Sequence, residues 1–320
     1  MTIAFTFPGQ GSQAVGMGRA MAQASPEAKS VFDEVDDALG RKLSALMWEG
    51  PEDELTLTEN AQPAIMAVSM AVMRVLEKEH GFALARHVKF VAGHSLGEYS
   101  ALAAAGAFTL ADAARLLRLR GSAMQKAAPA GTGAMAALLG LDLEDALAIA
   151  AEAALGEICE VANDNAQGQI VVSGHKQAVA RAIDLAKAKG AKRAVLLTVS
   201  APFHCRLMQP AAHVMAEALR EVSLRKPSVP VIANVTAEPQ SDPSAIRDLL
   251  IRQVTGMVRW RESIAAMARQ GVRIFCEVGA GKVLTGLARR IAPDARALAL
   301  GTPEEVGKAL SQIRETAHAL

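Results

Sequence analysis

The sequence predicts an α/β protein in which a small α+β domain interrupts a larger α/β domain. Apolar runs of strand length alternate with helical patterns along most of the chain, and this alternation is typical of α/β folds. Between about residues 134 and 199 the order changes to strand, helix, strand, strand, helix, strand. The 320 residues suffice for two domains at about 150 residues each.

The elements before residue 128 have recognisable boundaries. A buried strand is expected over 3–7. A helix is expected over 26–39, with Ser25 as N-cap, Pro26 in the first turn and Gly40 after its end. The further elements expected here are a helix over 63–80, a strand over 88–92, and helices over 96–105 and 109–127.

The interrupting segment has the element order of a ferredoxin-like domain. Its expected elements are strands over 134–139, 158–162, 169–173 and 193–199, and helices over 143–154 and 177–189. The α/β pattern then resumes, with strands near 229–234 and 274–278 and helices between and after them. The predicted division is residues 1–127 with 200–320 for the large domain and 128–199 for the small one.

Composition excludes several classes of function. The 34 basic and 33 acidic side chains give a net charge of +1, and aromatic residues make up 3%, so we expect no nucleic-acid partner. No apolar run reaches the length of a membrane span, and no basic segment precedes an apolar one, so neither an anchor nor a signal peptide is expected. Three cysteines without a CxxC spacing favour a reducing compartment, and we therefore expect a cytoplasmic protein.

The segment 93–97 (GHSLG) is the strongest candidate for a catalytic motif. A Gly-x-Ser-x-Gly pattern between a strand and a helix is the setting of a nucleophile elbow, which makes Ser95 a candidate nucleophile. A glycine-rich turn whose serine caps the helix is the alternative. A serine nucleophile needs a base, and His204 follows a predicted strand, where sites assemble in α/β sheets.

Two further features are candidates for binding. The loop 8–13 (PGQGSQ) matches a dinucleotide-binding pattern only loosely, because no acidic residue ends a second strand, and its exposed amides fit an oxyanion hole better. Arg120 lies on the apolar stripe of its helix, between Leu117 and Met124. It could form an internal salt bridge or clamp a substrate carboxylate, and its spacing leaves both interpretations open.

Together these motifs resemble a known family over essentially the whole chain. The matching segments are 7–13 (FPGQGSQ), 93–99 (GHSLGEY), Arg120-Gly121, 131–136 (GTGAMA), Asn163 with Gly168-Gln169, 202–204 (PFH), Arg252-Gln253 with Trp260, and 279–284 (GAGKVL). This set of ordered motifs resembles the malonyl-CoA:acyl carrier protein transacylases. The resemblance implies a hydrolase-like large domain with a parallel sheet, interrupted by the ferredoxin-like one.

The resemblance also implies the reaction and the catalytic residues. The malonyl group would pass from malonyl-CoA to the phosphopantetheine thiol of acyl carrier protein by a ping-pong mechanism, supplying fatty-acid or polyketide synthesis without a metal or other cofactor. Ser95 would carry the malonyl ester and His204 would be the base. The backbone carbonyl of Gln253 would orient His204, and the N–H groups of Gln10 and Leu96 would form the oxyanion hole.

Three more residues acquire binding roles from the resemblance. Arg120 would grip the malonyl carboxylate, and Asn163 would lie near the pantetheine arm. Phe203, like Leu96, matches the malonyl-type pattern of the family.

Two other functions fit parts of the sequence. A serine esterase would need an acid between the serine and the histidine, and Asp164 or Asp184 could supply it. That function leaves no role for Arg120 on its apolar stripe. A non-catalytic subunit that binds carrier protein would be indicated by loss of Ser95 or His204, and both are present.

Overall fold

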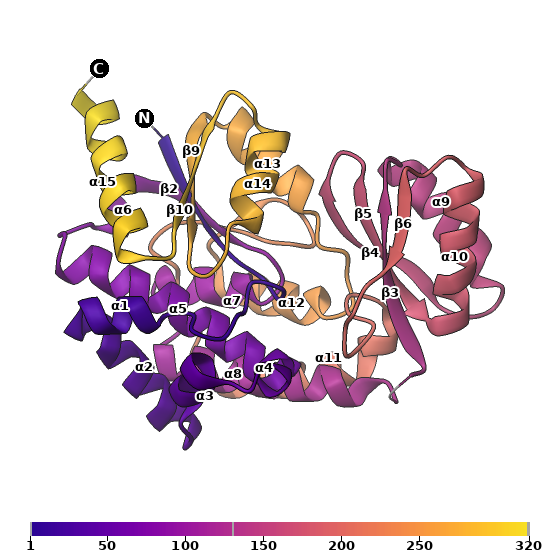
Figure 1. The fold of residues 1–320 in the computed structure, drawn as a ribbon, viewed down its shortest axis with the longest axis horizontal. Coiled ribbons are helices and arrows are strands. Elements are labelled where there is room, and N and C mark those ends of the chain that lie inside the picture. Colours follow the sequence, from indigo (N-terminus) through magenta and orange to yellow (C-terminus); the bar gives the residue numbers. More distant parts are fainter. Residues whose placement is uncertain (1, 130, 319–320) are drawn as a thin grey trace.

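The protein is built on two β-sheets that stand side by side (Figure 1). The computed structural model describes residues 2–129 and 131–318, apart from the side chains of 314–318. The larger sheet has the order β10-β9-β1-β2-β7-β8, in which only β8 runs antiparallel to its neighbour. Its strands are β1 (Thr2–Phe7), β2 (Val88–Gly93), β7 (Val231–Ile232), β8 (Pro239–Gln240), β9 (Val272–Val278) and β10 (Arg296–Leu300). The predicted α/β class is confirmed.

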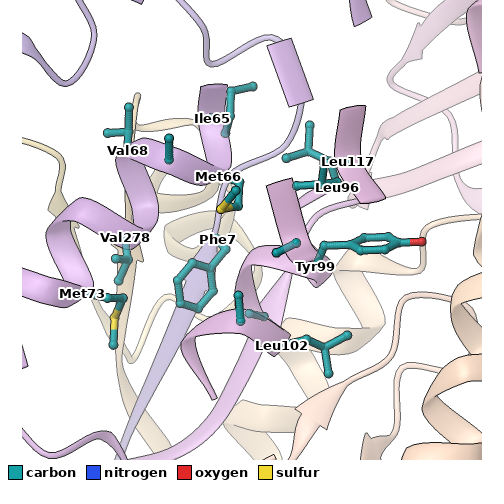
Figure 2. Packing of buried hydrophobic residues seen from close by; sticks show 14 of the residues in the cluster. Phe7, Ile65, Met66, Val68, Met73, Leu96, Tyr99, Leu102, Leu117 and Val278 are labelled. Carbon is teal, nitrogen blue, oxygen red and sulfur yellow. The ribbon is translucent and has the colours of Figure 1, made fainter. Parts of the chain in front are cut away.

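Helices cover both faces of this sheet (Figure 1). Strand β1 shows why, because Ile3, Phe5 and Phe7 enter one buried cluster while Ala4 enters another. Figure 2 shows Phe7 among side chains of α5, α7 and β9. The helices are α1 (Arg19–Ala24), α2 (Pro26–Leu39), α3 (Leu43–Glu49), α4 (Glu52–Thr56), α5 (Thr58–Lys78), α6 (Leu84–His87), α7 (Gly97–Ala104), α8 (Leu110–Ala127), α11 (Gln209–Glu221), α12 (Pro243–Gln253), α13 (Trp260–Arg269), α14 (Val283–Ile291) and α15 (Pro303–His318), with a 3-10 turn η1 (Arg206–Met208).

Helix α5 begins five residues before the predicted start at Pro63, so that prediction is wrong. A proline inside a helix has no N–H to donate to the carbonyl four residues earlier, which here belongs to Glu59. The guanidinium of Arg118 donates to that carbonyl instead (3.3 Å). Helix α8 therefore replaces the backbone hydrogen bond that Pro63 cannot donate, and α5 continues through the proline.

The smaller sheet has the order β4-β5-β3-β6, and all its neighbouring strands are antiparallel. Helices α9 and α10 pack on it through an alanine-rich cluster. The predicted order of four strands and two helices is found, although β6 ends three residues early. The elements are β3 (Gly133–Leu139), α9 (Leu143–Ala154), β4 (Cys159–Ala166), β5 (Gln169–His175), α10 (Lys176–Ala188) and β6 (Arg193–Leu196). The boundaries of the two domains, at 127/128 and 199/200, stay a prediction.

Strand β4 ties the small sheet to the large one. Val258, just before α13, donates its N–H to Ala162 O (2.8 Å), and its carbonyl accepts from Asp164 N (3.0 Å). The fully buried carboxylate of Asp164 also pairs with Arg261 of α13 (2.8 Å). These contacts join β4 of the small sheet to α13, whose apolar side chains pack against the large sheet.

None of the described helices is long and apolar enough to cross a membrane. Within the described part of the chain, no three His, Cys, Asp or Glu side chains form a group that could hold a metal ion.

Candidate active site

Ser95 lies in a strained turn between β2 and α7. Its φ of 55° is in the left-handed region, which non-glycine residues rarely adopt. A side chain at Gly93 would overlap the carbonyl of Gly97, and one at Gly97 would overlap the carbonyl of Phe7, so the turn requires both glycines. Asn234, after β7, holds the turn from outside: its Oδ1 accepts from Ser95 N (2.8 Å) and its Nδ2 donates to Gly93 O (2.7 Å).

The structure brings His204 to Ser95. Its Nε2 lies 2.8 Å from Ser95 Oγ, while its Nδ1 lies 2.9 Å from Gln253 O and 3.1 Å from Gly256 O. Backbone carbonyls only accept, so Nδ1 carries the proton and Nε2 is free to take one from the hydroxyl. Burial, and next the charge of Arg120, lower the pKa of His204 to about 3. The imidazole is therefore neutral at physiological pH, as a general base must be.

The acids that an esterase would need lie elsewhere. Asp164 pairs with Arg261, and the exposed Asp184 pairs with Lys187 (3.6 Å). His204 is oriented by carbonyls at its Nδ1, so neither aspartate occupies the place of a triad acid.

Arg120 reaches the nucleophile from α8. It is 1% exposed, and its Nη2 donates to Ser95 Oγ (3.3 Å) and to Gln253 Oε1 (2.8 Å). Its Nη1 donates to Gln62 Oε1 (2.9 Å), and its guanidinium carbon lies 5.7 Å from the centre of the Tyr99 ring. No ion pair found among the described residues includes Arg120. Neutral amides thus hold a buried cation beside the nucleophile, and burial lowers its pKa.

A cavity of about 650 Å³ opens between the two sheets. Every predicted site residue except Gln253 lines it: Gln10, Ser95, Leu96, Arg120, Asn163, Phe203 and His204. Gln253 is fully buried behind this group. The small sheet and the chain that leaves it contribute Met135, Val171 and Leu197. The cavity therefore depends on both sheets, and the roles given to its residues stay predictions.

Sequence reasoning missed three residues that position this site. Gln62 binds Arg120, Asn234 holds the elbow, and Glu98 accepts from Gln253 Nε2 (2.7 Å). Glu98 stands three residues after Ser95 on the first turn of α7, a position that could have attracted notice. The other two are contributed by α5 and by the loop after β7, and no local spacing relates them to Ser95.

The sequence of the chain was compared with those of known proteins and protein families. A family model described as an acyl transferase domain matches residues 4–298. The chain belongs to the acyl transferase family. The malonyl CoA-acyl carrier protein transacylase of Escherichia coli strain K12 is 48% identical over 96% of this chain and 98% of that protein.

Solved structures of related acyl transferases have the same fold. The acyl-carrier-protein-S-malonyltransferase of Bartonella henselae superposes with a TM-score of 0.96, at 58% identity over 98% of this chain and 99% of that one. A malonyl-transacylase in complex with a type II PKS acyl-carrier protein gives a TM-score of 0.94, at 44% identity over 98% of this chain and 100% of that one. The family resemblance expected from the motifs is confirmed.

Cys205 of this acyl transferase adjoins the proposed base, and its thiol is not expected to react. The side chain is fully buried, burial raises its pKa to about 11, and its Sγ donates to Pro202 O (3.2 Å). Cys205→Ser keeps a donor for that carbonyl, so we expect the variant to retain most malonyl transfer. Steady-state rates and circular dichroism check this, and a folded variant that no longer forms the acyl-enzyme would make the thiol the nucleophile.

Proposed function

We propose that this acyl transferase transfers the malonyl group from malonyl-CoA to the phosphopantetheine thiol of an acyl carrier protein. The observation that carries the proposal is the buried guanidinium of Arg120, 3.3 Å from the Ser95 hydroxyl inside the cavity. An acyl group that ends in a carboxylate, once attached to Ser95, would meet that cation. The names of the relatives point to the same reaction.

In the first half-reaction Ser95 Oγ attacks the thioester carbonyl and His204 Nε2 takes the hydroxyl proton. The backbone N–H groups of Gln10 and Leu96 are proposed to stabilise the oxyanion. As the C–S bond breaks, the protonated His204 returns the proton to the CoA thiolate, and the malonyl ester of Ser95 remains. In the second half-reaction the carrier thiol gives its proton to His204 and attacks the ester carbonyl. As the bond from that carbonyl to Ser95 Oγ breaks, His204 returns the proton to Ser95 Oγ and the malonyl-carrier thioester leaves.

The remaining cavity residues would bind the two substrates in turn. Arg120 would pair with the malonyl carboxylate in place of Ser95 Oγ. Leu96 and Phe203 would limit the size of the acyl group, and Asn163 would contact the pantetheine arm. The malonyl-carrier product would serve fatty-acid or polyketide synthesis, and a cytoplasmic location stays a prediction.

Intact-mass measurement after mixing the protein with malonyl-CoA alone tests the proposal. We expect a mass increase of one malonyl group, because the ester persists until a thiol arrives, and loss of that increase when the phosphopantetheinylated carrier is added. An unmodified mass together with rapid hydrolysis of a neutral nitrophenyl ester would instead indicate an esterase.

A further inference from the structure

A buried carboxylate lies behind the elbow and has no part in the mechanism above. Glu98 of α7 is 2% exposed and does not line the cavity. Its Oε2 accepts from Gln253 Nε2 (2.7 Å) and from Asn234 N (3.2 Å). A carboxylate is rarely buried without a charged partner, so its presence here needs a reason.

The amide of Gln253 connects this carboxylate to the cation of the site. Gln253 Oε1 accepts from Arg120 Nη2 (2.8 Å), while Gln253 Nε2 donates to Glu98. The guanidinium and the carboxylate are thus joined through one neutral side chain without touching. Each polarises the amide in the same sense, so the three groups form one charge-balanced unit.

The charged group that faces Glu98 is Arg120 of α8. The groups that face it from α12 and from the loop after β7 are Gln253 and Asn234, which carry no charge. His204 is neutral because its pKa is about 3, and burial raises the pKa of Tyr99 to about 12, so neither titrates near neutrality.

A malonyl group changes this balance. The empty site holds one buried cation and one buried anion, and the malonyl carboxylate adds a second anion beside Arg120. Two buried anions close to one cation repel each other. The anion whose protonation costs the least free energy therefore takes up a proton. Burial already raises the pKa of Glu98 to about 7, against the opposing effects of its hydrogen bonds and of Arg120.

We propose that Glu98 is the resident counter-charge of Arg120 and that it takes up a proton from solvent when a malonyl group occupies the site. The malonyl carboxylate then replaces Glu98 as the anion that balances Arg120. Glu98 touches no substrate, so it acts as a positioning residue that keeps the empty site neutral. This inference rests on the proposed malonyl transfer.

The sign of the pH dependence follows from this exchange. Occupancy by malonyl raises the pKa of Glu98 further, so a proton is taken up on binding above about pH 7 and none is taken up well below it. The kcat/KM for malonyl-enzyme formation is therefore level below about pH 7 and falls above it, by at most about tenfold per pH unit. Acetyl-CoA carries the same CoA phosphates but no acyl carboxylate, so its kcat/KM has no such fall.

Rapid-mixing kinetics of CoA release, without carrier protein, from about pH 6 to about pH 8.5 test the proposal in the full protein. Wild-type protein should show the fall with malonyl-CoA and not with acetyl-CoA. Glu98→Gln keeps the acceptor oxygen and removes the titration, so its malonyl profile should be flat. Glu277→Gln is the matched control, because Glu277 is also a buried carboxylate but binds Leu284 N and Thr285, and it should keep the wild-type profile.

The same fall in wild type and Glu98→Gln, or a parallel fall with acetyl-CoA, would overturn the inference. If Glu98→Gln does not fold, proton uptake by wild-type protein is measured with an indicator dye. Uptake should approach one proton per malonyl-enzyme at about pH 8 and vanish at about pH 6, and no uptake at the higher pH would refute the exchange. A wild-type protein that forms no malonyl-enzyme contradicts the proposed function itself, whereas one that forms it without pH dependence contradicts only the role of Glu98.

Discussion

Replacing Ser95 by alanine is expected to abolish the malonyl-enzyme and to lower malonyl transfer by on the order of 10⁴–10⁶-fold. The hydroxyl is the group that lies 2.8 Å from His204 Nε2 and receives the Arg120 hydrogen bond, so nothing else in this arrangement can attack the thioester. Alanine is smaller than serine and keeps the backbone N–H of residue 95, which donates to Asn234 Oδ1. Intact mass and peptide mapping after incubation with malonyl-CoA measure the result.

His204→Ala is the matched variant for that prediction. It keeps the nucleophile and removes the base, so acylation should slow by roughly 10²–10⁴-fold while the label still accumulates on Ser95 at long times. Thermal unfolding of both variants controls for loss of fold. A label on the Ser95→Ala protein, or one mapped to Cys205, would refute the serine mechanism.

Arg120→Ala is expected to reverse the acyl selectivity of the enzyme. In the native protein malonyl pairs directly with a buried guanidinium, whereas acetyl leaves that cation balanced only by the Glu98 carboxylate on the far side of Gln253. A charge-assisted pair contributes about 1.5–3 kcal/mol, so malonyl should be favoured by on the order of 10–10²-fold in kcat/KM. The alanine variant removes this pair and leaves the malonyl carboxylate without a cation, so malonyl transfer should collapse while acetyl transfer holds or rises.

Two further variants sharpen that measurement. Arg120→Lys should restore only part of the malonyl activity, because an ammonium cannot form a two-pronged contact with a carboxylate. Arg115→Ala removes an exposed arginine of the same helix, whose Nε donates to Ala38 O, and should leave selectivity unchanged. Equal loss of malonyl and acetyl transfer in Arg120→Ala would show that the residue is structural.

Local patterns predicted much of the fold and the centre of the site. Helix α2 begins with the expected Ser25 cap, whose hydroxyl accepts from Ala28 N, and ends before Gly40 with its φ of 62°. Helix α8, expected over 109–127, is capped by Thr109, whose hydroxyl accepts from Asp112 N. The elbow at Ser95 could also be predicted, because its glycines and its flanking strand and helix are contiguous in sequence.

What could not be predicted depends on distant parts of the chain. The strand expected over 229–234 is shortened to β7 (Val231–Ile232), and beyond it Asn234 binds the elbow instead of continuing the strand. The strand expected over 193–199 ends at Leu196, and the residues after it line the cavity. Strand β10 (Arg296–Leu300) was not predicted, because after Arg296 it contains only alanine and leucine, which show no apolar/polar alternation and favour helices.

The close backbone contacts at the elbow mean that some positions of the site tolerate substitution and others do not. Because Gly93 and Gly97 touch neighbouring backbone, no substitution there can alter acyl preference without displacing the nucleophile. Met135, Val171 and Leu197 face the same cavity from the other sheet. Directed evolution of the acyl preference towards longer or branched acyl groups should therefore vary those three positions and keep both glycines.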